Sequence, residues 1–251
     1  MKVQRGIVVI VDVSGYTNFV KMHAFSIVHA EWLISELMKT IAKEFGAPVQ
    51  LNKLEGDAAM FFVWINDPAK EHALVKLTMQ SALAAFRAFK MKRDDMLAAN
   101  LCPCCACPEL GKLSVKAVFH IGDVVEKRVL NKDELAGDTV IIAHRLLKNA
   151  LQSHEYFLMT KPFYDSAGKS LALEAKVMNQ SVEGYGEIEV AAIDGELLDQ
   201  KIEKMPPVKR SILKGILQVF NMEYYMLKRS AHLIERQKFA HLPEAHASAA
   251  E

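Results

Sequence analysis

The order of expected elements along the 251-residue chain predicts a mixed α/β fold, an α+β sandwich in which helices cover one or both faces of a sheet. A β-branched run at 6–13 is typical of a buried strand. Apolar residues recurring at three- and four-residue steps predict a long amphipathic helix over 25–45. A second long helix, rich in alanine, is expected over 69–91. Strands and helices that follow one another in this way argue for packed layers around one core.

The remaining elements follow from turn signals and periodicity. A Glu-Gly-Asp turn at 55–57 separates two short apolar runs, 49–54 and 58–64, and this spacing predicts a β-hairpin with the glycine in the turn. The helical pattern expected over 138–151 begins at the pair Asp138-Thr139, which is typical of a helix start. After a loop at 100–109, the sequence predicts strands at 113–125, 156–160, 171–179 and 187–193 and a helix at 138–151.

Composition restricts the classes of function. Hydrophobic residues make up 51% and charged residues 24%, so a sizeable core is expected. A formal net charge of +1 gives no general case for nucleic-acid binding, which usually requires a clustered basic excess. The apolar stretch 6–11 is far shorter than the roughly 20 residues of a spanning helix, and no secretory signal is expected. All four cysteines lie within 102–107, which favours a reduced, cytoplasmic protein over a disulfide framework.

Two carboxylates are the first candidate site residues. Asp12 ends a predicted buried strand, where an unpaired carboxylate is costly, and Asp57 lies in a hairpin turn that can place it beside that strand. Adjacent carboxylates repel each other unless a cation neutralises them, and Mg²⁺ prefers oxygen ligands of this kind. The spacing by itself is more typical of a capping residue and a turn residue that bind no metal.

Four motifs follow one another along the chain, namely DVSGYT at 12–17, KLEGD at 53–57, FHIG at 119–122 and GDTV at 137–140, the last followed by Ala143 and Arg145. Together they resemble motifs of class III adenylate and guanylate cyclases. Each motif is weak alone, but together they cover about residues 5–195. The cysteine loop and the sequence HRLLKN at 144–149 also resemble a branch of that scaffold catalogued as a domain of unknown function. The resemblance implies a cyclase-homology domain at 1–195, with a ferredoxin-like core sheet covered by helices, and a C-terminal helical extension at 196–251.

The resemblance implies a metal site and an assembly. Asp12 and Asp57 would bind Mg²⁺ or Mn²⁺, and the backbone carbonyl of Val13 would assist. Such ions would neutralise charge as the ribose 3′-oxygen attacks the α-phosphorus. In this family the site is shared across a head-to-tail dimer, so a homodimer is expected.

The resemblance also implies how a purine nucleotide would be bound. Lys53 matches a base-reading lysine, which favours ATP, and Glu134 falls near a second base-reading position. Thr17 belongs to the motif around the nucleotide. Arg145 matches the arginine that stabilises transition-state charge on the phosphates.

Two departures from the family pattern put catalysis in doubt. The helix asparagine that orients the ribose falls on Ile141, and the phosphate-binding lysine of the terminal hairpin falls on Tyr185. Losing one preorganised polar group costs on the order of 10²–10³ in rate. Two hypotheses follow: a weak or inactive adenylate cyclase-like lyase, and a dimeric module that senses nucleotide or metal without turnover.

The cysteine loop is a second constellation. Cys102, Cys104, Cys105 and Cys107 could close a tetrahedral zinc site, with His120 a further but unneeded ligand. The C-x-C-C-x-C spacing is not a standard zinc-finger pattern, and a reduced loop without metal is the more usual interpretation. His120 is expected to be a packed strand histidine rather than a catalytic residue.

The C-terminal extension contains an amphipathic stretch at 209–238 that combines an apolar helical stripe with lysines and arginines. Such a helix could lie on an anionic membrane surface. Packing on the domain or on a partner protein is favoured, because most amphipathic helices of soluble proteins cover a core.

Overall fold

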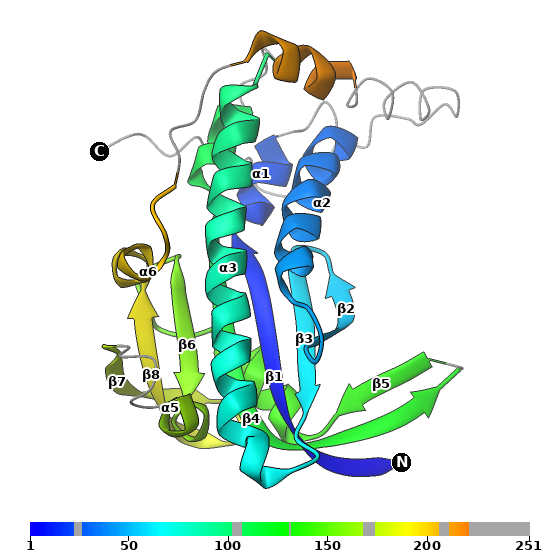
Figure 1. Cartoon of the computed structure of the whole chain (residues 1–251), viewed down its shortest axis with the longest axis vertical. Coiled ribbons are helices and arrows are strands. Elements are labelled where there is room, and N and C mark those ends of the chain that lie inside the picture. The colour runs from blue at the N-terminus through cyan, green and yellow to red at the C-terminus, as the bar shows by residue number, and fades with distance from the viewer. Residues whose placement is uncertain (23–26, 102–106, 131, 168–173, 206–210, 221–251) are drawn as a thin grey trace. The chain divides into compact units, whose positions relative to one another are not determined.

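The computed structural model describes residues 1–22, 27–101, 107–130, 132–167, 174–205 and 211–220 (Figure 1). The chain forms two compact units, one of residues 1–14, 40–89 and 114–204 and the other of residues 15–39, 90–113 and 205–251. The sequence predicts a different division, into a domain at 1–195 and an extension at 196–251. That division stays a prediction.

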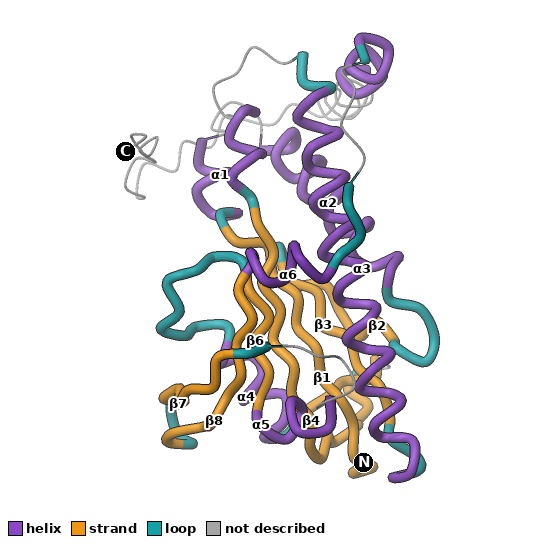
Figure 2. The backbone as a smooth tube through the Cα atoms, turned by 60° about the vertical axis from the view of Figure 1, so that its left-hand side comes forward, coloured by secondary structure: helices purple, strands orange, loops and turns teal. Residues whose placement is uncertain are grey.

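Within the described residues, the strands belong to the first unit and form one sheet, drawn in orange in Figure 2. Its order is β2-β3-β1-β4-β6-β8-β7, and β5 pairs with β4 off this path. The neighbouring strands are antiparallel except for the parallel pair β4 and β6. The strands are β1 (Lys2–Ser14), β2 (Gln50–Glu55), β3 (Ala58–Trp64), β4 (Ser114–Val129), β5 (Lys132–Ala136), β6 (Tyr156–Thr160), β7 (Lys176–Val182) and β8 (Gly186–Asp194).

Helices account for most of the remaining described residues, and residues 212–220 are helical as well. The helices in chain order are α1 (Tyr16–Met22), α2 (Ile27–Glu44), the short 3₁₀ helix η1 (Pro68–Lys70), α3 (Glu71–Ala98), η2 (Cys107–Lys112), α4 (Asp138–Leu146), α5 (Lys161–Ala167) and α6 (Gly195–Lys201). In the described part of the chain, none of them combines the length and the hydropathy needed to cross a membrane.

The two faces of the sheet carry different cores. β1 lies between β3 and β4 and is covered on both faces, which explains its unbroken apolar run. Alternate residues such as Val8 and Val118 pack with α4 on one face. On the other face, Phe86 of α3 contacts Phe157, and Phe163 of α5 stacks on the ring of β4 residue Phe119. The predicted α+β sandwich is therefore confirmed.

Several boundaries differ from the expected ones. The predicted helix at 138–151 ends at Leu146, because the side chain of Asn149 donates to the Leu146 carbonyl (2.8 Å) and satisfies one of the last helix acceptors. β5 and α5 were not predicted. The expected strand at 171–179 begins within residues outside the described part, and its described portion starts at Lys176.

Candidate functional site

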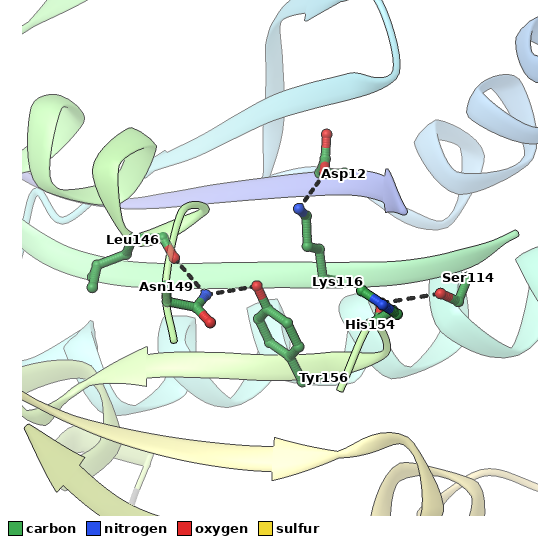
Figure 3. Close-up of polar contacts among 7 residues, drawn as sticks. All are labelled: Asp12, Ser114, Lys116, Leu146, Asn149, His154 and Tyr156. Atoms are coloured by element: carbon green, nitrogen blue, oxygen red, sulfur yellow. Dashed lines mark hydrogen bonds and ion pairs between the residues drawn. The ribbon is translucent and has the colours of Figure 1, made fainter. Parts of the chain in front are cut away.

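A row of polar side chains crosses the α4 side of the sheet near the end of β1 (Figure 3). Asp12, Lys116 and Tyr156 lie opposite one another in the register of β1, β4 and β6. The Nζ of Lys116 is 2.9 Å from Oδ2 of Asp12, and these side chains are only 22% and 14% exposed. The Nδ2 of Asn149 donates to the Tyr156 hydroxyl (2.6 Å). The Asp12 carboxylate therefore has a largely buried cationic partner.

The phenol of Tyr156 remains neutral beside this ion pair. Burial is the main cause that raises the pKa of Tyr156, and the hydrogen bond from Asn149 and the charge of Lys116 oppose the shift. The charge of Asp12 raises the pKa further. Tyr156 and Asn149 are thus polar but uncharged neighbours of the ion pair.

The predicted hairpin of β2 and β3 brings Asp57 next to the end of β1. Asp12 pairs with Ala58 in the register of β1 and β3, and the Val13 amide donates to the Asp57 backbone carbonyl (3.0 Å). The three positions expected to form a metal site therefore lie together along the backbone. A shared cation between the two carboxylates stays a prediction.

The residues at this strand end offer oxygen donors, but their arrangement does not fit a magnesium ion. The ammonium of Lys116 already neutralises the Asp12 carboxylate that a divalent cation would use. A divalent ion that bound Oδ2 of Asp12 would have to displace this ammonium. Elsewhere, the described residues contain no cluster of three or more His, Cys, Asp and Glu side chains suited to a metal.

The second group of candidate residues lies where α4 meets the β7–β8 hairpin. Arg145 has its guanidinium carbon 5.7 Å from the centre of the Tyr185 ring and its Nη2 4.0 Å from Oε2 of Glu183. The Tyr185 hydroxyl donates to Oδ1 of Asp138 (2.7 Å), and this hydrogen bond raises the pKa of Tyr185. The hairpin is therefore tied to both ends of α4.

The structure places Ile141 one helical turn before Arg145, on the same face of α4. Ile141 is 41% exposed, which is unusual for a large apolar side chain and marks a face that does not belong to the core. The positions that the resemblance assigns to ribose and phosphate binding, 141, 145 and 185, are thus brought together.

Lys53 lies in β2 and has its Nζ 2.6 Å from Oε1 of Glu55. The other carboxylate oxygen of Glu55 is 3.9 Å from Nε2 of His144 on α4. Burial lowers the pKa of His144, the charge of Glu55 opposes this shift, and Lys53 adds to it. The sequence analysis did not identify His144 and Glu55 as site residues. Their positions next to Arg145 and near Lys53 in the sequence could have indicated them.

The other predicted nucleotide and metal residues are more dispersed. Glu134 lies in β5, opposite Lys127 of β4. Thr17 is an exposed residue of α1 in the second unit. His120 lies within β4, and its Nδ1 is 2.7 Å from Oγ1 of Thr160, so its ring is used in packing between β4 and β6.

The cysteine loop is described only at its end. Cys102, Cys104 and Cys105 lie outside the described residues. Cys107 begins η2 and is buried, with its Sγ 3.5 Å from Nε2 of His29 in α2. Both residues belong to the second unit. His29 was missed because it lies 78 residues away in sequence.

The amphipathic stretch at 209–238 lies outside the described residues except for 211–220. In that part Lys214 pairs with Asp95 (3.1 Å) and Gln218 donates to the Met96 carbonyl (3.2 Å). The apolar side chains of the stripe are exposed, namely Ile212, Leu213, Ile216, Leu217 and Phe220.

Comparisons with known proteins agree with this architecture. Residues 34–156 match the family described as "Protein of unknown function (DUF2652)". The uncharacterized protein Rv2561/Rv2562 of Mycobacterium tuberculosis is 32% identical over 159 residues, which are 63% of this chain and 70% of the relative.

Solved structures of nucleotidyl cyclases share the fold at low sequence identity. A bacterial light-regulated adenylyl cyclase matches with a TM-score of 0.57 at 16% identity, over 88% of this chain and 58% of that one. The present chain therefore spans less than two thirds of that cyclase. The adenylyl cyclase CyaB from P. aeruginosa matches with a TM-score of 0.53 at 14% identity, over 77% of this chain and 96% of that one. The chain belongs to the DUF2652 family, and its fold is that of class III nucleotidyl cyclase domains.

Proposed function

We propose that the protein binds a purine nucleotide, with ATP favoured, on the α4 side of its cyclase-like sheet and converts it to a cyclic nucleotide slowly or not at all. The observation that carries this proposal is the face of α4 that presents Ile141 and Arg145 beside Tyr185. The structural relatives named as adenylyl cyclases support the substrate class.

Arg145 keeps the capacity to bind a phosphate. Its guanidinium is 38% exposed, and its contact with Glu183 at 4.0 Å is a loose surface ion pair. Exposed pairs of this kind contribute about 0–1 kcal/mol, so a phosphate can compete for the guanidinium. Its planar fork of donors suits phosphate oxygens.

The neighbouring positions do not supply the rest of the chemistry. Ile141 has no hydrogen-bonding group for a ribose, and the Tyr185 hydroxyl donates to Asp138 and carries no positive charge. Each missing preorganised group costs on the order of 10²–10³ in rate. Binding with little turnover is therefore the expected behaviour. The Asp12 carboxylate, which the resemblance assigns to Mg²⁺ or Mn²⁺, is paired with the ammonium of Lys116.

A second candidate is a nucleotide-sensing homodimer without turnover, arranged head-to-tail. The contacts of Arg145 with the β7–β8 hairpin favour it. A phosphate bound to Arg145 would compete with Glu183 and the Tyr185 ring, and binding would thereby change how the hairpin is held.

The test uses the purified full chain with ATP or GTP in the presence of Mg²⁺ or Mn²⁺. Calorimetry should detect ATP binding, and mass spectrometry should find little or no cyclic product. Arg145→Ala should weaken ATP binding, whereas the control Arg87→Ala should not, because Arg87 pairs with Glu203 away from α4 (3.8 Å). Absence of nucleotide binding would refute the proposal, and rapid turnover unaffected by Arg145→Ala would show that α4 is not the catalytic helix.

The preference for adenine has its own test. Lys53→Glu places a carboxylate beside Glu55 and removes the donor expected to read adenine. The variant should bind ATP several-fold more weakly, roughly the effect of one lost charged hydrogen bond, without a matching loss for GTP. Equal affinities for both nucleotides before and after the change would remove Lys53 from the site.

A further inference from the structure

Lys116 places a built-in cation on the carboxylate that a divalent metal ion would need. We propose that Lys116 sets the cation preference of the strand-end site: in the nucleotide-free protein its ammonium holds Asp12, and divalent ions bind weakly as long as it stays there. The inference deepens the proposed function, on which its relevance to nucleotide binding rests.

The fold keeps the two groups together. Asp12 and Lys116 are direct partners in the antiparallel register of β1 and β4, and both belong to the face that packs with α4. Directly opposite residues have their Cβ atoms about 4.5–5.5 Å apart. The 2.9 Å contact between Nζ and Oδ2 therefore follows from strand pairing rather than from a chance position of a surface side chain.

Burial makes the pair difficult to separate. The two side chains are 22% and 14% exposed, so water and salt screen their attraction less than at an open surface. A divalent ion that takes the carboxylate must also leave the ammonium of Lys116 in a partly buried place without that partner. Separating one partner from a buried pair is strongly unfavourable.

Two groups next to the pair, Tyr156 and Asn149, offer Lys116 no substitute charge. Tyr156, its register partner on β6, has a raised pKa because of burial, and its hydroxyl accepts a hydrogen bond from Asn149 (Figure 3). Both neighbours are neutral. A phosphate group brought by a nucleotide is an anion that could take the ammonium and free Asp12.

The experiment measures Mn²⁺ binding to the full chain in the absence of nucleotide, by electron paramagnetic resonance of the free ion. Wild type should bind Mn²⁺ weakly. Lys116→Met keeps the apolar stem and removes the charge, which leaves a partly buried carboxylate that a cation relieves. Mn²⁺ affinity should rise by about tenfold or more, the equivalent of one partly buried charge interaction.

Three further variants isolate the cause. Lys116→Arg keeps the positive charge and should bind Mn²⁺ as weakly as wild type. Adding Asp12→Asn to Lys116→Met should abolish the gain. Lys161→Met removes another lysine that lies 3.4 Å from Asp165 and 3.7 Å from Glu189, and it should leave Mn²⁺ affinity unchanged. Lys116→Gln replaces the methionine variant where that one is not folded by circular dichroism.

Mn²⁺ affinity of Lys116→Met or Lys116→Gln within twofold of wild type would overturn the inference. A gain that persists after Asp12→Asn would overturn it as well, because the ion would then bind elsewhere. The assay contains no nucleotide, so its outcome is independent of the ATP-binding test: a chain that never binds ATP can still show the Lys116 effect.

Discussion

The resemblance to cyclases assigns a hydrogen-bonding residue to position 141, where this chain has an isoleucine whose side chain is exposed. Ile141→Asn should therefore restore a ribose contact, and Tyr185→Lys should add a charge near Arg145. If the protein binds ATP as proposed, the double variant should form cyclic product at least about 10²-fold faster than wild type, a gain typical of one recovered positioning group. Product accumulation is measured by mass spectrometry.

The matched control is Ile141→Leu, which keeps an apolar side chain at the same exposed position of α4. It should leave turnover unchanged. Equal rates of cyclic product formation in Ile141→Asn and Ile141→Leu, compared in the same background, would show that residue 141 does not approach the ribose.

Cys107 and His29 form the described part of a candidate zinc site. Their Sγ–Nε2 separation of 3.5 Å suits two ligands of one tetrahedral ion, because Zn–S and Zn–N bonds of about 2.3 and 2.0–2.1 Å place such ligand atoms about 3.5 Å apart. The purified chain should retain about one zinc per molecule through dialysis, and Cys107→Ala or His29→Ala should lower this content markedly. Elemental analysis decides.

The zinc prediction has a control in His154→Ala, which changes a histidine of the first unit and should leave the zinc content at its wild-type value. Protein purified under reducing conditions without zinc would decide for a reduced loop. The 3.5 Å contact would then be an ordinary thiol–imidazole contact.

The residues of the candidate site could be predicted from sequence only where a local motif carried them. Asp12 lies near the end of a strand and Asp57 in the turn of a hairpin, and both signals are local. Lys116 could not be predicted as the partner of Asp12, because that contact depends on the register between strands 104 residues apart. His29 was missed because its contact with Cys107 joins two helical segments that are 78 residues apart in the sequence.

At the scale of elements, α4 lies close against β4 because residue 122 has no side chain. A Cβ at Gly122 would lie 2.5 Å from Oγ1 of Thr139, which donates to the Asp123 carbonyl (2.7 Å). Gly122→Ala should push the start of α4 away from the sheet and lower the free energy of unfolding by about 1–3 kcal/mol, as overpacking does. Urea unfolding followed by circular dichroism measures the change.

Gly46→Ala is the matched control, because a Cβ at Gly46 would meet nothing within 4 Å. Its free energy of unfolding should equal that of wild type or exceed it slightly. A Gly122→Ala variant as stable as this control would mean that α4 adapts without loss.

Elements with strong periodicity were predictable, and those formed by tertiary pairing were not. β1 and α3 follow from an apolar run and a helical repeat. The sequence of β5, KDELA, has low strand propensity. The segment is extended because it pairs with β4. The end of α4 depends on the hydrogen bond from the Asn149 side chain to the Leu146 carbonyl. Hydrophobic periodicity gives no indication of this hydrogen bond.

At the scale of the first unit, the two faces of the sheet are lined differently. The α4 side carries the Asp12–Lys116 pair and the groups at both ends of α4, including Arg145. The opposite side is filled by packed phenyl rings such as Phe86 and Phe157. The charged candidate residues Asp12, Lys116 and Arg145 therefore lie on one face of the sheet.

His120 makes the stability of the folded chain depend on pH. Burial, assisted by the charge of Arg5, lowers the pKa of His120 to about 4 from its ordinary value of 6.5. Between these two values the unfolded chain binds a proton at this position and the folded chain does not, so the free energy of unfolding decreases as the pH falls. The contribution is complete above about pH 6.5, and about 2–3 kcal/mol of it should be lost by pH 4, after allowance for partial exposure.

The prediction is measured as the difference between wild type and His120→Gln in urea unfolding at several pH values. Glutamine can keep a hydrogen bond to Thr160, whose Oγ1 lies 2.7 Å from the imidazole, but it does not titrate. Carboxylates titrate in the same range, and they contribute equally to both proteins, so the difference isolates the histidine. The stability advantage of wild type over the variant should shrink steadily from pH 6.5 to pH 4. Parallel pH profiles of the two proteins would show that His120 is protonated as easily in the folded chain as in the unfolded one.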